Sequence, residues 1–99
     1  MNNYILNDQG KPVLEPNILR WARWYESADR RVAWSDISQG VHVSTVFLGI
    51  DHNFGGGPPL LYETMVFGGP MDQHQERYTT REEAVAGHEE VVRRVKEIL

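Results

Sequence analysis

Two segments, residues 41–50 and 60–67, constrain the fold most, because each is rich in the β-branched and aromatic residues that favour β-strands. Successive side chains of a strand point to opposite faces, and both faces of the first segment are apolar. One face would carry Val41, Val43 and Phe47, and the other Val46, Leu48 and Ile50. A sheet with one face in water alternates more strictly between apolar and polar residues. We therefore expect both faces to be covered, either by helices or by a second copy of the chain, and the second option predicts a homodimer.

Helical patterns lie on either side of these segments. A first helix is predicted to begin near Pro16 and to end around Arg30, with an apolar stripe at helical spacing that consists of Ile18, Trp21, Tyr25 and Ala28. A second helix is predicted after Thr80, because Thr80 and Glu83 match a capping box. Its stripe consists of Ala84, His88, Val91, Val95 and Ile98. Gly87 is unfavourable within a helix by about 1 kcal/mol relative to alanine, which indicates close packing at that position.

The sequence thus predicts an α+β fold in which a helix, a three-stranded antiparallel sheet and a second helix follow one another. Residues 31–37 supply the weakest of the three strands, and a polar loop is expected to run from Gly68 to about Tyr78. Residues 1–15 are expected to form an extended N-terminal arm, which the turn at 7–10 either folds into a small hairpin or leaves lying along the body, and residues 16–99 a single domain.

The composition argues against several classes of function. The 99 residues include no cysteine, so the chain can form neither a disulfide nor a thiolate–metal site, and it suits a reducing cytoplasm. A net charge of −4 is unfavourable for binding duplex nucleic acid, which requires clustered Lys and Arg. We find neither a signal-peptide pattern nor the ~20 consecutive apolar residues that a membrane helix needs. The four histidines show no metal-binding spacing, and we expect no cofactor.

The connector between the two strongest strands is the most unusual segment. It spans residues 51–59, whereas a tight hairpin needs only about two to five residues. Consecutive glycines allow backbone N–H groups to approach a ligand and to form an anion-binding concavity. The alternative is a flexible connector whose exit is stiffened by two prolines. The candidate ligand-binding residues of this loop are Asp51, His52, Asn53, Phe54, Gly55, Gly56 and Gly57.

The predicted topology brings basic residues to the same end of the molecule. In a three-stranded meander the connector lies beside the end of the first helix, with Arg30 and Arg31, and beside the end of the last helix. The last helix would contribute Arg93, Arg94 and Lys96. Guanidinium groups and glycine N–H groups at one edge would suit a phosphate or a carboxylate. The alternative is that these side chains only complement the helix dipoles.

Three further residues are candidates for a site. Glu63 shares a strand face with apolar residues, so it either binds a ligand or forms an ion pair with Arg23 or Arg31. Trp24 lies at the edge of the first helical stripe and is a candidate for contact with a partner. His52 could form an acid–base couple with Asp51, but neighbouring residues at a strand end usually point to opposite sides. No catalytic residue is assigned.

Four segments together resemble a family of small hypothetical proteins of tailed phages and prophages. They are residues 21–26 (WARWYE), 43–52 (VSTVFLGIDH), 62–69 (YETMVFGG) and 84–88 (AVAGH), and the likeness extends from about residue 19 to 92. The resemblance implies a phage-encoded accessory protein that acts in the host cytoplasm.

Three functions follow as expectations from the residues and this resemblance. The first is non-enzymatic binding and sequestration of an anionic small molecule, such as a host signalling nucleotide, in an anti-defence role. The second is inhibition of a host protein by direct contact, without a small-molecule pocket. The third is a small hydrolase or transferase that uses His52 with Asp51 or Glu63.

Overall fold

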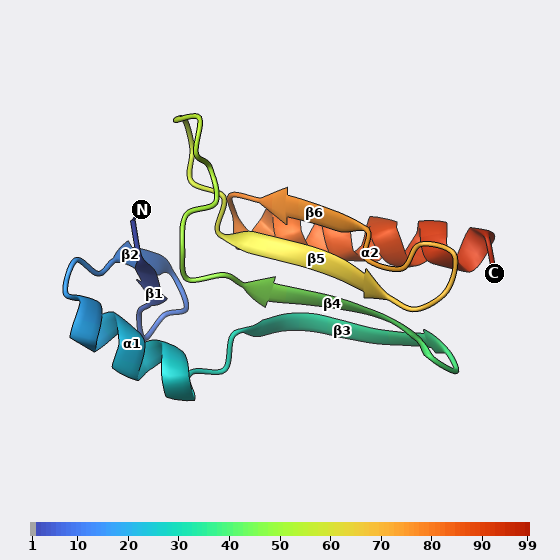
Figure 1. Cartoon of the computed structure of the whole chain (residues 1–99), viewed down its shortest axis with the longest axis horizontal. Coiled ribbons are helices and arrows are strands. Elements are labelled where there is room, and N and C mark those ends of the chain that lie inside the picture. The colour runs from blue at the N-terminus through green and yellow to red at the C-terminus, as the bar shows by residue number, and fades with distance from the viewer. Residues whose placement is uncertain (1) are drawn as a thin grey trace.

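The computed structural model describes residues 2–99 and is organised around a four-stranded antiparallel sheet. The strand order follows the chain: β3 (Arg31–Ser38), β4 (Val41–Phe47), β5 (Tyr62–Phe67) and β6 (Gln75–Tyr78). The C-terminal helix α2 (Arg81–Glu97) lies along one face of this sheet, whereas the N-terminal part of the chain sits beyond one end of it (Figure 1). The molecule is therefore elongated, with extents of 44 × 29 × 21 Å.

The N-terminal part consists of a two-stranded hairpin followed by a helix. Strands β1 (Tyr4–Leu6) and β2 (Pro12–Leu14) pair antiparallel, and helix α1 covers Ile18–Ser27. The side chain of Asn7 accepts hydrogen bonds from the backbone of Gln9 and Lys11, which closes the hairpin turn. The side chain of Asn17 accepts from two amides in the first turn of α1, and so caps that helix.

The core lies between α2 and the sheet. Val41, Val43 and Val66 pack against Val91 and Val95 of the helix. A second cluster at the other end of the sheet consists of Phe47, Leu61, Tyr62 and Ala84, and Tyr4, Leu6 and Trp24 of the N-terminal part pack on it. Every second residue of β4 is buried, as expected for a strand with one face against a helix.

The opposite face of the sheet is left open by the helices. It carries the half-buried side chains of β4 and β5, and an exposed Trp34 and Phe67. Strand β4 ends at Phe47, so Leu48 and Ile50 of the expected second apolar face lie outside it, and the open face of β4 carries His42, Ser44 and Val46. The homodimer expected from two apolar faces stays a prediction.

The predicted arrangement of one helix, three strands and another helix is wrong in two respects. The sheet has a fourth strand, β6, within the segment that was expected to be a polar loop, and the expected arm of residues 1–15 contains a second, two-stranded sheet. The alternating pattern of β6 is hard to recognise because only Glu76 and Tyr78 face the helix and one of them is charged.

The first helix also differs from expectation. It is shorter than the predicted span of residues 16–30, and none of its residues is buried. Helix α1 lies beside β1, and its Trp24 reaches the end of the sheet at Phe47. Its apolar stripe faces the hairpin and the end of the sheet: the indole N–H of Trp21 donates to the backbone oxygens of Gly49, at 2.9 Å, and Tyr4, at 3.2 Å.

The second helix follows the prediction closely. Thr80 and Glu83 form the reciprocal capping box, and Ala84, His88, Val91 and Val95 are buried as predicted. Ile98, the fifth residue of the predicted stripe, lies at the C-cap and is 50% exposed, because the helix ends at Glu97. The close packing expected at Gly87 is also confirmed, because a Cβ at this position would lie 2.3 Å from the ring of Tyr78. No helix within residues 2–99 has both the length and the apolar character needed to cross a membrane.

Candidate functional site

The glycine-rich connector is held by its own side chains. The carboxylate of Asp51 accepts hydrogen bonds from the amides of Asn53, at 2.8 Å, and Leu60, at 3.0 Å. The side-chain amide of Asn53 donates to the backbone oxygen of Pro58 at 2.8 Å. Gly56 and Gly57 adopt positive φ, and Phe54 near the tip is 74% exposed. The polar groups of Asp51 and Asn53 are thus occupied in shaping the loop.

Asp51 and His52 do not form a catalytic pair in this structure. The Nδ1 atom of His52 lies 2.8 Å from the backbone oxygen of Ile50, while the Asp51 carboxylate bonds the two amides described above. A general base needs a carboxylate or another group that orients its imidazole toward a reacting atom. The Ile50 oxygen orients the imidazole of His52, and Asp51 is not its partner, so the expected acid–base couple of Asp51 and His52 is not formed.

Arg30 and Arg31 stack on aromatic rings on either side of the start of β3. The guanidinium of Arg30 lies 4.0 Å from the centre of the Tyr25 ring and donates to the backbone oxygen of Phe47 at 3.0 Å. The guanidinium of Arg31 lies 4.6 Å from the centre of the Trp34 ring. The expected grouping of these two guanidiniums around the connector is not observed.

Glu63 and Trp24 have structural partners. Glu63 accepts from Arg77 of the neighbouring strand at 2.9 Å, and not from the expected Arg23 or Arg31. The indole of Trp24 packs edge-on against Phe47, with ring centres 5.8 Å apart, at the margin of the second core cluster. Trp24 thus joins the helix to the sheet end, and its role as a partner contact stays a prediction.

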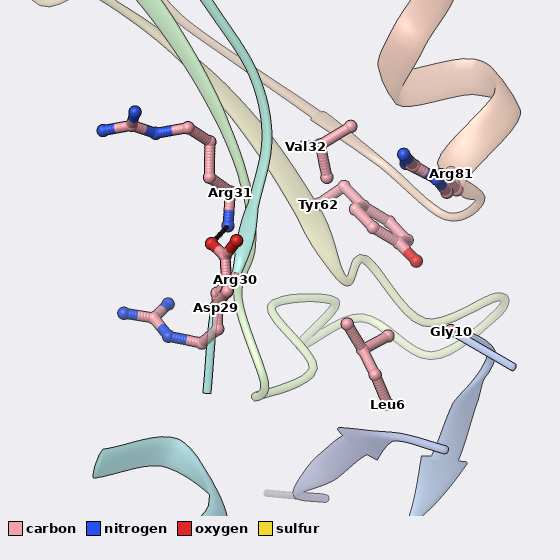
Figure 2. Close-up of a pocket in the computed structure, with 8 residues that line it drawn as sticks. All are labelled: Leu6, Gly10, Asp29, Arg30, Arg31, Val32, Tyr62 and Arg81. Atoms are coloured by element: carbon pink, nitrogen blue, oxygen red, sulfur yellow. Dashed lines mark hydrogen bonds between the residues drawn. The ribbon is translucent and has the colours of Figure 1, made fainter. Parts of the chain in front are cut away.

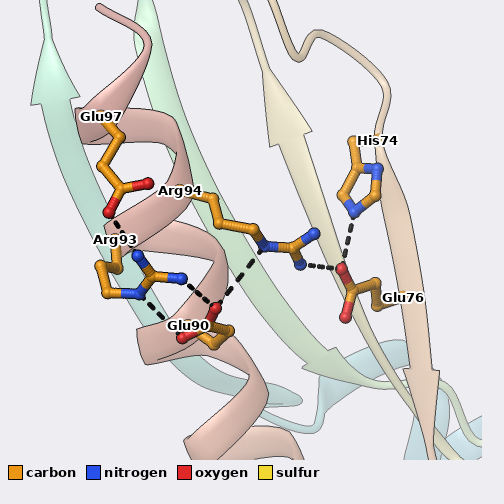
Figure 3. A network of polar contacts seen from close by, with 6 residues as sticks. All are labelled: His74, Glu76, Glu90, Arg93, Arg94 and Glu97. Atoms are coloured by element: carbon orange, nitrogen blue, oxygen red, sulfur yellow. Dashed lines mark hydrogen bonds and ion pairs between the residues drawn. The ribbon is translucent and has the colours of Figure 1, made fainter.

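The expected convergence of the last helix on the connector is wrong. The extra strand β6 reverses the chain once more, so α2 begins at the end of the sheet where the connector lies and finishes at the far end (Figure 1). The arginines of its last turns are also engaged by carboxylates. Figure 3 shows Arg93 between Glu90 and Glu97, and Arg94 beside Glu76.

A cleft lies instead between the N-terminal hairpin and the beginning of α2. It consists of two adjoining hollows of about 220 Å³ and 440 Å³, which share Gly10, Tyr62 and Arg81 as lining residues. The smaller hollow reaches the turn before β3, and the larger one extends over Lys11 and the start of α2. Arg30 and Arg31 line the smaller hollow, but Figure 2 shows that their guanidinium groups extend away from Tyr62.

Tyr62 is the distinctive residue of this cleft. Its side chain is 1% exposed, and its hydroxyl has no hydrogen-bond partner within residues 2–99. In Figure 2 the hydroxyl points toward the part of the cleft where Arg81 and Gly10 lie. A buried hydroxyl without a partner costs about 1–3 kcal/mol, so an acceptor that entered the cleft would remove this cost.

Charges of both signs surround the Tyr62 hydroxyl: Arg81 and Lys11 line the cleft and favour an anion, whereas Asp29 and Glu82 line it with carboxylates. Burial raises the pKa of Tyr62, Arg81 acts to lower it and Glu82 to raise it, so the phenol stays protonated and can donate a hydrogen bond. Thr80 satisfies the amide of Glu83, whereas the amides of Arg81 and Glu82, at the positive end of the α2 dipole, have no acceptor within residues 2–99. Lys11 adds a second cation at the rim of the larger hollow.

Sequence reasoning did not identify this cleft. Tyr62 was predicted to lie within a strand. The one signal that could have identified it is that a buried tyrosine hydroxyl usually has a hydrogen-bond partner. Arg81 was visible only as the residue after a capping threonine. Their approach to the hairpin turn at Gly10 depends on the direction of α2, which the missed strand β6 determines.

Comparison of the chain with protein-family models, with curated proteins and with solved structures finds no match. Residues 2–99 also contain no group of three or more His, Asp or Glu side chains that could hold a metal ion. The site is therefore interpreted from its own geometry.

Proposed function

We propose that this protein binds a small anionic molecule in the cleft between its N-terminal hairpin and the start of α2. The observation that carries the proposal is the Tyr62 hydroxyl, which is buried, lacks a hydrogen-bond partner within residues 2–99 and points toward the part of the cleft where Arg81 lies (Figure 2). The larger hollow of about 440 Å³ is within the range of ~300–1,000 Å³ typical of small-molecule sites.

Each group would contribute a different part of the recognition. The neutral phenol of Tyr62 donates one hydrogen bond to a phosphate or carboxylate oxygen. The guanidinium of Arg81 supplies charge and can donate two parallel hydrogen bonds. The first amides of α2 complete the site, as helix N-termini do for many bound phosphates. Lys11 would attract the anion at the rim.

The resemblance to phage proteins supports a biological setting for this binding. In a host cell, a protein that binds a nucleotide tightly and does not turn it over lowers the free concentration of that nucleotide. We therefore propose sequestration of a host signalling nucleotide as the activity. The arrangement of Asp51 and His52 described above fits binding without catalysis.

The proposal is tested by calorimetry and thermal denaturation of the full chain against inorganic phosphate and a panel of mononucleotides, cyclic nucleotides and dinucleotides. A bound ligand at a thousand times its dissociation constant should stabilise the protein by about 4 kcal/mol. Failure of every anion in the panel to bind would contradict the proposal.

Two variants separate binding from stability. We expect Tyr62→Phe to weaken ligand binding and to raise the unfolding free energy of the ligand-free protein by about 1 kcal/mol, because it removes a buried hydroxyl without a partner. Arg81→Gln should weaken binding with little change in stability, because the side chain is exposed.

The matched control is Tyr78→Phe. Its hydroxyl donates to Thr64 Oγ1 at 3.1 Å, so its removal should cost about 1 kcal/mol of stability and leave ligand binding unchanged. Ligand binding by Tyr62→Phe with the affinity of the parent protein would show that the Tyr62 hydroxyl takes no part in the site.

A further inference from the structure

The open face of the sheet is ordered in three rows across the strands. Cross-strand pairing places the residues of each row side by side on the face opposite α2. The row nearest the connector contains Arg31, Val46, Glu63 and Arg77, the middle row Trp34, Ser44, Met65 and Gln75, and the far row Asp36, His42 and Phe67. The charges therefore lie at the two ends of the strands, and the large apolar side chains lie between and beside them.

Three rings on this face stack against one another. The centres of Trp34 and His42 are 4.2 Å apart and those of His42 and Phe67 are 4.8 Å apart, with interplanar angles of 21° in both pairs. The second spacing matches the distance between neighbouring strands, so the rings stand on edge on the sheet. Their edges point outward, and the guanidinium of Arg31 covers one outer ring face.

This geometry favours a protein surface over nucleic acid as the occupant. Proteins that bind single strands present ring faces on which bases stack, together with a positively charged groove. Here both faces of Trp34 and His42 are covered within the stack, which leaves one face of Phe67, and the chain has a net charge of −4. Rings that stand perpendicular to the sheet, with grooves between them, can interdigitate with the side chains of a second sheet packed on this face.

Arg31 and Asp36 place opposite charges at the two ends of β3 on this face. Both are exposed, and within residues 2–99 neither forms an ion pair with another side chain. Five residues of extended strand separate their Cα atoms by about 16 Å, which is too far for them to pair with each other. Opposite charges at the two ends of one apolar stripe are self-complementary under a two-fold rotation that reverses the strand.

We propose that the open sheet face is the interface of a homodimer, with a two-fold axis that crosses the strands through the middle row. This axis places β3 of one protomer over the same strand of the other in the opposite direction. Asp36 then meets the partner's Arg31, and the symmetric pair forms at the other end. The middle row, with Trp34 and Met65, packs on itself at the centre.

The area of this face sets the expected strength of association. Four strands, the longest of eight residues, give a surface at the small end of specific interfaces. We expect a dimer that dissociates in the micromolar range. Sedimentation analysis of the full chain from about 1 μM to about 500 μM covers the range of a weak, transient interface.

Charge reversal tests the proposed pairing. Arg31→Asp and Asp36→Arg should each raise the dimer dissociation constant by about tenfold or more, because each places like charges opposite one another twice. The double variant restores opposite charges and should return the constant to near the original value. Arg23→Asp, at an exposed position on α1, is the matched control and should change nothing.

A second variant keeps the test valid if a charge reversal impairs folding. Phe67 is 39% exposed at the end of the ring stack, and Phe67→Glu should abolish association while the melting curve shows a folded protein. Tyr62→Phe in the cleft should leave association unchanged.

Three results would overturn the proposal. The first is a protein that stays monomeric throughout the concentration range. The second is a double charge reversal that fails to recover association. The third is binding of a single-stranded oligonucleotide that Phe67→Glu abolishes, since this would assign the face to nucleic acid.

Discussion

At the scale of single residues, a buried chain of hydrogen bonds joins the sheet to α2. His88 is 4% exposed, and its Nδ1 atom lies 2.7 Å from Thr45 Oγ1, while its Nε2 atom lies 2.9 Å from Ser35 Oγ. Thr45 in turn lies 2.6 Å from Thr64, which also accepts from Tyr78. Buried polar groups are tolerated when each has a partner, as here. The helix is thereby fixed in register on the sheet.

This network makes stability depend on pH. Burial lowers the pKa of His88 from its ordinary value of 6.5, so the folded protein binds a proton there less readily than the unfolded chain does. The contribution of neutral His88 to stability is complete above pH 6.5 and is lost as the pH falls toward the lower pKa of the folded state. We expect the unfolding free energy in urea to be lower at pH 5.5 than at pH 7.5.

His88→Gln is the informative comparison, because an amide can still bond two hydroxyls but does not titrate. The variant should have a flatter stability profile over this pH interval. An equally steep profile in the variant would assign the effect to other groups.

At the scale of elements, the packing of α2 on β6 depends on the absence of a side chain at Gly87. A Cβ there would lie 2.3 Å from the Tyr78 ring, which is far inside van der Waals contact. Tyr78 is held by its hydrogen bond to Thr64, so it cannot turn away freely. The low helix propensity of glycine is therefore offset by the close packing of α2 on the edge strand β6.

Gly87→Ala is expected to destabilise the protein by about 1–3 kcal/mol, although alanine is the better helix former by about 1 kcal/mol. The overpacking against Tyr78 outweighs the gain in propensity. The control is Ala86→Gly at the exposed neighbouring position, which should cost about 1 kcal/mol through propensity alone. Chemical denaturation measures both, and a stabilised Gly87→Ala protein would contradict the observed packing.

The sequence predicted the elements with strong local signals and also the weaker strand at residues 31–37, which is β3, but it missed β6. Residues 41–47 and 62–67, with their branched and aromatic side chains, and the capped helix after Thr80 were identified correctly. Strand β6 has a charged side chain at one of its two inward positions, so it lacks an apolar alternation. Its stability comes from pairing with β5, which is a tertiary effect that local patterns do not contain.

The candidate site could not be predicted for a related reason. A site formed by Tyr62, Arg81 and Gly10 joins three elements that are distant in the chain. Their approach follows from the direction of α2, and the count of strands fixes that direction. One missed strand was enough to place the basic end of α2 beside the connector, when it lies at the other end of the sheet.

At the scale of the whole molecule, the N-terminal hairpin and α1 are attached to the sheet through few contacts. The amide of Tyr4 donates to the oxygen of Gly49 at 2.8 Å, and Asn3 forms an isolated bridge with Ile50. Gly49 adopts a φ of 77° and lies so close to Tyr25 that a Cβ would be 3.2 Å from its ring. The backbone hydrogen bonds between the two parts thus converge on residues 49–51, and Tyr4, Leu6 and Trp24 add apolar contacts with the second core cluster.

We expect this N-terminal part to open before the sheet unfolds. In native-state hydrogen exchange, the amides of α1 should exchange through a local opening of lower free energy than the amides of β4 and β5, because no residue of α1 is buried. Exchange of α1 amides only through global unfolding would show that the two parts form one cooperative unit.

The order of the strands in the large sheet has a consequence for how the chain folds. Each of its strands pairs with the strand that precedes or follows it, and α2 closes the series. The entropy cost of closing a loop rises only slowly with its length, so even the long connector before β5 adds little, and folds dominated by such neighbouring contacts reach their native state quickly. We therefore expect the sheet to assemble hairpin by hairpin on a millisecond timescale or faster, before the amino-terminal hairpin docks on Ile50.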